Sequence, residues 1–132
     1  MATAIHTYPT QAYQDTEVMT ADPRRRVVLL FDSMVRELCA AREAMAQRDY
    51  HGQCTSIVRT QRILSVLASA LQDGEAPGIA RALGSLYHWA HAKLTEASLS
   101  DDEVLLAEIT QIIVGLRDAW REAELQCRGA VS

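Results

Sequence analysis

Histidine and cysteine are the side chains of this sequence whose type and spacing could support metal or nucleophilic chemistry. His88 and His91 lie three residues apart, as do His51 and Cys54, so each pair could share one face of a helix. A structural metal site needs two further ligands, and a di-iron bundle needs Glu-x-x-His on two helices. No Glu lies three residues before any histidine of the chain. We therefore expect no metal site, with these histidines at the surface or half-buried.

Motifs for other catalytic chemistry are also missing from the sequence. Cys39 and Cys54 fall beside or on predicted core positions, where a free cysteine packs as a small apolar side chain. Neither thiol is expected in the cationic surroundings that would make it reactive. The chain has no Gly-rich phosphate loop, no Gly-x-Ser-x-Gly turn and no paired-carboxylate motif. We therefore expect no enzyme activity, no catalytic residue and no cofactor.

Charge and hydropathy exclude further classes of function. The 132 residues carry a net charge of −4, which disfavours binding to a phosphate backbone. The basic run Arg24–Arg26 is more typical of a solvated helix end, or of a contact with an acidic partner. The longest apolar run, residues 27–31, is far shorter than the roughly 20 residues of a membrane helix. We expect neither nucleic-acid binding nor membrane insertion.

The cysteines and the first residues indicate a compartment. Three cysteines, an odd number without a Cys-x-x-Cys pair, are atypical of a disulfide framework and favour reducing conditions. The first basic side chain is Arg24, so no positively charged segment precedes an apolar stretch as in a signal peptide. These features predict a cytoplasmic protein.

Four stretches of helical periodicity must position these side chains. In the first, apolar residues recur at steps of four and three from Val27 through Phe31 to Met45. The predicted helices span residues 23–47, 52–72, 77–98 and 101–127. Asp22 and Pro23 are typical of a helix start, Ser100–Glu103 of a capping box, and Gly129 of a helix stop. The fold class is all-α: an antiparallel up-down four-helix bundle over residues 22–128, after an extended or partly helical arm over residues 1–21.

Apolar residues outside the packing stripes are the most informative anomaly. A bundle helix needs one apolar stripe, yet Val28 and Leu29 cannot both share the seam of Val27 and Phe31. At 100° per residue, Val58 and Val66 also lie off the inward face of the second predicted helix. Either these side chains form a groove for an amphipathic helical ligand, or they are covered by the N-terminal arm or by a second copy of the chain.

Runs of residues along the chain resemble those of the flagellar secretion chaperone FliS family, from Ala12 to about Ala123. The most specific are in the arm and the first helix, and shorter ones follow in each later helix. They are Ala12-Tyr13-Gln14 with Val18, Thr20-Ala21-Asp22-Pro23, Val28-Leu29-Leu30-Phe31-Asp32, Gln61–Leu64, Leu67–Leu71, Gly78-Ile79-Ala80, Leu86-Tyr87 and Leu116–Trp120. Their order and spacing together carry the resemblance.

The resemblance implies an export chaperone that is not an enzyme. Such a chaperone binds the disordered C-terminal region of flagellin in apolar grooves, prevents premature polymerisation in the cytosol and delivers flagellin to the export gate. By position, Tyr13 of the arm either covers the groove in the free protein or packs on the bundle. Asp32 is either a polar clamp for client backbone or a solvated helix residue. The predicted partner-binding residues are Tyr13, Val18, Val28, Leu29, Asp32, Val58, Ile63 and Val66. The alternative is a structural or regulatory bundle that homodimerises and has no flagellin client.

Overall fold

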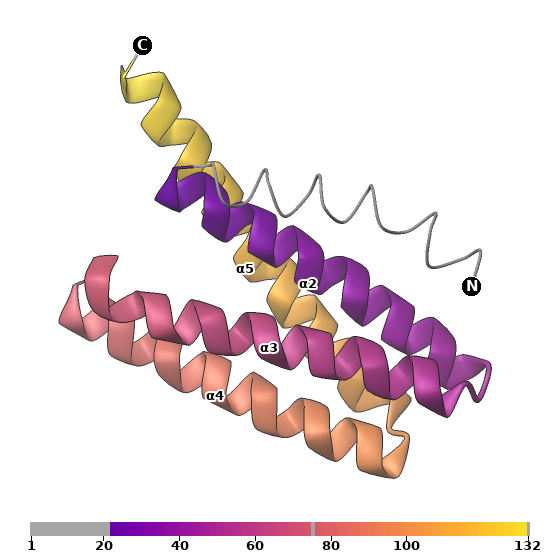
Figure 1. Ribbon diagram of the computed structural model, residues 1–132. Helices are drawn as coiled ribbons and strands as arrows, with labels where there is room; N and C mark the ends of the chain where they lie inside the picture. Colours follow the sequence, from indigo (N-terminus) through magenta and orange to yellow (C-terminus); the bar gives the residue numbers. More distant parts are fainter. Residues whose placement is uncertain (1–21, 75, 132) are drawn as a thin grey trace, which may run out of the picture.

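The computed structural model describes residues 22–74 and 76–131. The predicted arm over residues 1–21, with its expected partner-binding residues Tyr13 and Val18, lies outside this part of the chain. Four helices make up the described part, in the order α2 (Pro23–Ala46), α3 (Tyr50–Gly74), α4 (Pro77–Ser100) and α5 (Glu103–Val131). The described part of the chain is therefore an all-α bundle of four helices, as predicted (Figure 1).

Helix packing follows the order of the chain, because short turns make each helix antiparallel to the next. α2 lies between α3 and α5 and packs closely against both, while α4 packs against α3 and much less against α5. Figure 1 shows why: α5 crosses the bundle at an angle and diverges from α4 toward its C-terminal end. The α4–α5 side is thus the open side of the bundle.

Local capping explains where α2 and α3 begin. The Asp22 side chain accepts a hydrogen bond from the Arg25 backbone N–H at 3.0 Å, with Pro23 in the first turn, as the sequence predicted. Asp49 does the same for the Gly52 N–H at 3.0 Å. This cap starts α3 at Tyr50, two residues before the predicted start.

The turn between α4 and α5 differs from the predicted capping box. Ser100 still belongs to α4, and its hydroxyl donates to the Glu96 carbonyl at 2.8 Å. Asp101 ends α4 in the left-handed conformation, with φ of 50°. Asp102, rather than Ser100, caps α5 by accepting from the Leu105 N–H at 3.0 Å. The predicted stop at Gly129 is also wrong, because α5 continues to Val131.

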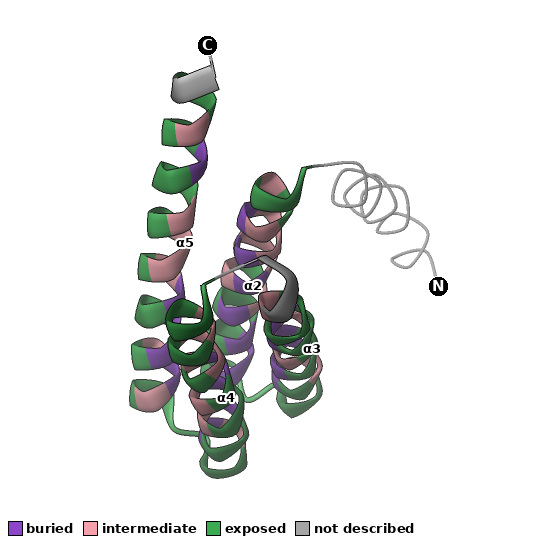
Figure 2. Ribbon diagram, turned by 90° about the vertical axis from the view of Figure 1, so that its left-hand side faces the viewer, coloured by how far each residue is buried: buried purple, intermediate pink, exposed green. Residues whose placement is uncertain are grey.

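The core lies along the axis of the bundle, where the buried faces of the four helices meet (Figure 2). Its largest fully buried side chains include Phe31, Met34 and Leu38 of α2, and the Phe31 ring lies 6.3 Å from that of Tyr87 on α4. Among the described helices, none combines the length and the apolar character that crossing a membrane requires.

A buried glutamine closes one end of the bundle. The Gln53 side-chain amide on α3 donates to the Ser98 carbonyl at 3.3 Å, the Ser98 hydroxyl at 3.4 Å and the Asp101 carboxylate at 3.1 Å. Gln53 is only 2% exposed, so these bonds replace water for its amide N–H groups. They join α3 to the α4–α5 turn, and α5 diverges from α4 away from this joint.

Candidate protein-binding surfaces

The first apolar surface, which we call the α2–α3 face, follows the junction of these two helices. Glu37 on α2 pairs with Arg59 on α3 at 3.7 Å. Because the helices are antiparallel, residues before Glu37 lie level with residues after Arg59. This register brings Leu29 to the level of Ile63 and Val66. Leu29 and Ile63 are half-buried and Val66 is 54% exposed, so these three predicted binding residues lie at the same level of the bundle.

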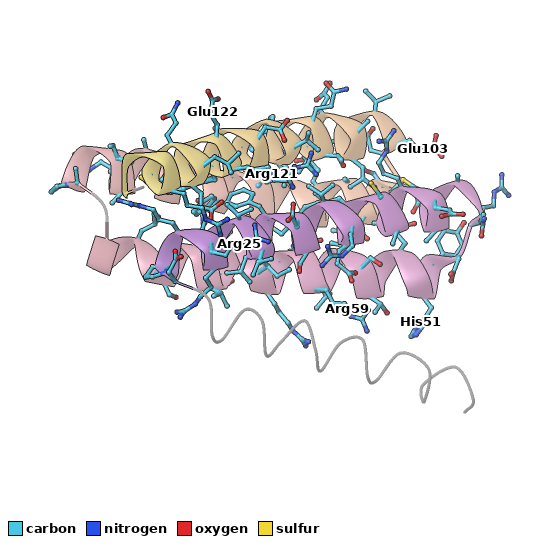
Figure 3. All side chains as sticks on the ribbon, turned by 90° about the horizontal axis from the view of Figure 1, so that it is seen from above. Arg25, His51, Arg59, Glu103, Arg121 and Glu122 are labelled. Carbon is cyan, nitrogen blue, oxygen red and sulfur yellow. The ribbon has the colours of Figure 1, made fainter. Side chains whose placement is uncertain are left out.

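Two other predicted binding residues lie on the opposite side of α2, toward α5. Asp32 accepts a hydrogen bond from Arg121 of α5 at 2.8 Å and lies 4.0 Å from Arg117. Figure 3 labels Arg121 on α5. Its carboxylate is therefore engaged across the helices and would have to leave these arginines to bind a partner. Val28, one turn earlier on the same side, is fully buried. It offers no surface to a partner, which corrects the expectation for this residue.

A second surface is the groove between α3 and α4, which we call the α3–α4 groove. It has a volume of about 290 Å³. Its lining residues are Leu64, Ser65, Ala68, Gly84, Tyr87, His88 and His91. Val58 lies two turns before Ser65 on the same side of α3 and is 37% exposed, so it extends this groove rather than the α2–α3 face. The predicted binding residues thus lie on different sides of the bundle.

Small side chains form the groove and a polar contact closes one end. The Gln61 amide on α3 donates to the His91 carbonyl at 2.9 Å and to the Thr95 hydroxyl at 2.8 Å. Further along, Gly84 leaves room on α4: a Cβ there would lie 3.7 Å from Leu71, an ordinary contact distance. Sequence reasoning identified His88 and His91 only as a weak metal pair and missed Gly84, which is informative only beside its neighbour on α3.

The third surface, the α4–α5 face, lies along the apolar sides of these two helices. Ile79 on α4 is 53% exposed and Ile112 on α5 is 37% exposed. Their partly buried neighbours on the two helices are Leu86, Trp89, Leu116 and Trp120. Ile79 and Ile112 remain exposed although they lie on apolar helix sides, because α4 packs only weakly against α5.

The thiols and histidines form no reactive centre in the described chain. Cys39 and Cys54 are exposed, in contrast to the buried packing expected of them, and Cys127 is partly exposed. Across residues 22–74 and 76–131, no three His, Cys, Asp or Glu side chains are placed to hold a metal ion. The apolar surfaces are therefore the features of this part of the chain most suited to binding.

Comparison with known proteins gives these surfaces a context. The sequence matches the family described as "Flagellar protein FliS" over residues 6–126. It is 25% identical to the flagellar secretion chaperone FliS of Bacillus subtilis over 115 residues, covering 87% of this chain and 85% of that protein. It is 26% identical to the flagellar secretion chaperone FliS of Escherichia coli over 121 residues, covering 88% and 89%.

A second chaperone and a solved structure agree with these matches. The chain is 28% identical to the flagellar secretion chaperone FliSB of Pseudomonas aeruginosa over 106 residues, covering 80% of this chain and 84% of that protein. A crystal structure of a bacterial flagellar chaperone superimposes with a TM-score of 0.73 at 18% identity, over 89% of this chain and 98% of that one. The structural match shows the shared fold, and the match over residues 6–126 shows that this chain belongs to the flagellar protein FliS family, a family of chaperones and not of enzymes.

Proposed function

We propose that this protein is a cytoplasmic export chaperone that binds the C-terminal region of flagellin along its apolar surfaces. Bound flagellin is kept from polymerising and is delivered to the flagellar export apparatus. Family membership and the names of the relatives from Bacillus subtilis and Escherichia coli support an export chaperone role. The proposal adds the client segment, the binding surfaces and the delivery step.

The observation that carries the proposal is apolar surface that the bundle does not use for its own packing. Isolated exposed apolar residues are normal on proteins, but grouped ones mark interaction sites. Here they group along three helix junctions, with Val66 on the α2–α3 face, Val58 beside the α3–α4 groove and Ile79 on the α4–α5 face. Grooves between helices suit amphipathic helical segments, which insert one apolar stripe.

Competition for apolar side chains explains how such a chaperone would act. Flagellin subunits assemble through amphipathic terminal helices, so a terminus held in these grooves is withheld from the filament. Each large side chain that becomes buried contributes about 1.5–3 kcal/mol. A few such anchors offset the entropy lost when a disordered client becomes ordered. Binding spread over several surfaces gives affinity while the client remains unfolded enough for export.

Binding to flagellin tests the proposal directly. We expect the full chain to form a 1:1 complex with full-length flagellin in size-exclusion chromatography with light scattering, and to lose it when the C-terminal segment of flagellin is deleted. A chain that elutes as a dimer and ignores flagellin would support the alternative of a homodimerising bundle. Unchanged binding to the truncated flagellin would place the client segment elsewhere.

A glycine substitution tests the role of the α3–α4 groove. Gly84→Leu should fill the groove with an apolar side chain, while the loss of a mid-helix glycine favours the fold. We expect affinity for the flagellin C-terminal segment to fall by roughly tenfold or more in calorimetry, because an apolar anchor is displaced. The matched control is Gly115→Leu on α5, where a Cβ would meet no atom within 4 Å. Equal affinities for the two variants would exclude this groove as a client site.

A further inference from the structure

The end of the bundle that Gln53 closes has the most exposed apolar side chains of the described chain. Leu99 is 82%, Val104 70% and Tyr50 61% exposed, more than any other large apolar side chain that the structure describes. Gln53 and Asp101 are joined by a hydrogen bond of 3.1 Å. Each of the three apolar residues is two or three positions from one of these two, so their Cα atoms lie within about 11 Å of this joint. Apolar exposure grouped in this way marks an interaction site.

The same region, residues 48–53 and 98–104, is acidic, and we call it the closed end. Its carboxylates outnumber its guanidinium groups by four to one: Asp49, Asp101, Asp102 and Glu103 against Arg48. Figure 3 shows His51 of α3 and Glu103 of α5 at this one end of the bundle. The closed end therefore combines exposed apolar side chains with negative charge.

A recess between α2 and α5 adjoins the closed end and shares Glu103 with it. Its volume is about 330 Å³. The lining residues that matter here are two apolar ones, two carboxylates and one guanidinium: Met45, Leu106, Glu43, Glu103 and Arg42. Such a recess suits a Lys or Arg side chain, whose aliphatic stem packs on apolar surface while its cationic end pairs with a carboxylate.

We propose that the closed end docks a protein segment in which Lys or Arg residues flank apolar ones, with one of the cations in the recess. Charge complementarity selects this occupant. Negative charge disfavours a second copy of the chain, whose own closed end is equally acidic, and it disfavours anionic lipids and nucleic acids. The three surfaces proposed for flagellin run along the sides of the helices and include no residue of the closed end. The inference therefore goes beyond client binding and does not rest on it.

Two synthetic peptides test the inference on the full chain. Both have the same leucine positions, flanked by Lys in one peptide and by Glu in the other. We expect the Lys peptide to bind roughly tenfold more tightly in calorimetry at an ionic strength of about 0.05 M, and the difference to shrink at about 1 M salt. Equal binding of the two peptides, or no binding of the Lys peptide, would overturn the inference.

Removal of the exposed apolar side chains locates the binding. Leu99→Ser with Val104→Ser should weaken binding of the Lys peptide by roughly tenfold. The matched control is Ile79→Ser with Leu125→Ser, which removes similarly exposed side chains at the other ends of the same two helices and should keep the affinity. Equal losses in the two variants would contradict the proposed location. A chain that dimerises, and becomes monomeric in the first variant only, would make a second copy the occupant instead.

The native thiols report on the recess. Cys39 lines it, whereas Cys127 lies 24 residues beyond Glu103 on α5, a distance of about 36 Å. Bound Lys peptide should slow the alkylation of Cys39 by iodoacetamide several-fold and leave that of Cys127 unchanged, as measured by mass spectrometry. Glu43→Gln with Glu103→Gln should remove this protection, whereas Asp118→Asn with Glu122→Gln, which changes the net charge equally, should keep it. Unchanged alkylation of Cys39 would show that no cation enters the recess.

Discussion

The α2 and α4 helices have the same length, 24 residues, and differ sharply in how they are used. α2 lies between two neighbours and has buried residues along nearly its whole length, from Val28 to Met45. α4 has buried residues only from Tyr87 to Ala97, and residues 77–86 include none. One helix supplies the core of the bundle, and the first half of the other supplies surface.

Both helices are amphipathic, so apolar periodicity alone does not separate them. Periodicity shows which side of a helix is apolar, whereas burial requires a neighbour on that side. α2 has α3 and α5, while the first half of α4 has α3 but lacks close contact with α5. An apolar stripe that no neighbouring helix covers is the kind of surface to which an amphipathic helix binds.

Paired leucine truncations should give the largest difference between the core along α2 and the apolar surface of the α4–α5 face. Leu38→Ala removes a fully buried side chain on the α2 axis, and we expect a loss of about 2–5 kcal/mol in the free energy of unfolding. Leu116→Ala on the α4–α5 face removes a half-buried side chain, and roughly half that loss is expected. Urea unfolding followed by circular dichroism measures both. If the two losses were equal, the α4–α5 face would belong to the core.

Loss of the Gln53 amide should have a smaller effect that tests the closed end of the bundle. Gln53→Ala removes the donor to Ser98 and Asp101, and we expect a loss of about 1–3 kcal/mol. Gln111→Ala, at an exposed position on α5, is the control and should change stability by less than about 0.5 kcal/mol. Equal values would show that the amide does not hold the α4–α5 turn in place.

The smallest effect is expected at the ion pair between α2 and α5. Arg121→Ala removes the 2.8 Å contact with Asp32, but the Arg121 side chain is 46% exposed, so solvent screens the charges. We expect a loss of about 0.2–1 kcal/mol that diminishes in high salt. A double-mutant cycle with Asp32→Asn isolates the pair. A coupling free energy that did not depend on salt would indicate packing rather than charge.

The sequence predicted most of the fold because helix positions depend on local residues. Asp22 and Pro23 marked the start of α2, and their capping is present in the structure. The α4–α5 turn was predicted less well because Ser100 and Asp102 are both good caps. In the structure Asp102 is the cap, and the neighbouring Asp101 accepts a hydrogen bond from Gln53, which is 48 residues away in the chain. A contact over this distance cannot be read from the residues around the turn.

The binding surfaces were predicted only in part. Single-helix periodicity correctly placed Val58 and Val66 among the exposed residues. It could not show that they border different neighbours, because that depends on the register set by Glu37 with Arg59 and by Gln61 with His91. Val28 was assigned to the binding surface for the same reason: it is buried on the side of α2 that faces α5, which is three helices later in the chain.

The hydrogen bonds of Gln53 to Ser98 and Asp101 affect how α4 and α5 could move relative to each other. Because α3 is joined there to the α4–α5 turn, a rotation of α5 about that turn would widen the α4–α5 face and leave these hydrogen bonds in place. Displacement is then smallest at Asp101 and largest at the first turn of α4 and the last turns of α5. The proposed flagellin client would therefore find the most room at these free ends, while the hydrogen bonds of Gln53 to Ser98 and Asp101 remain intact.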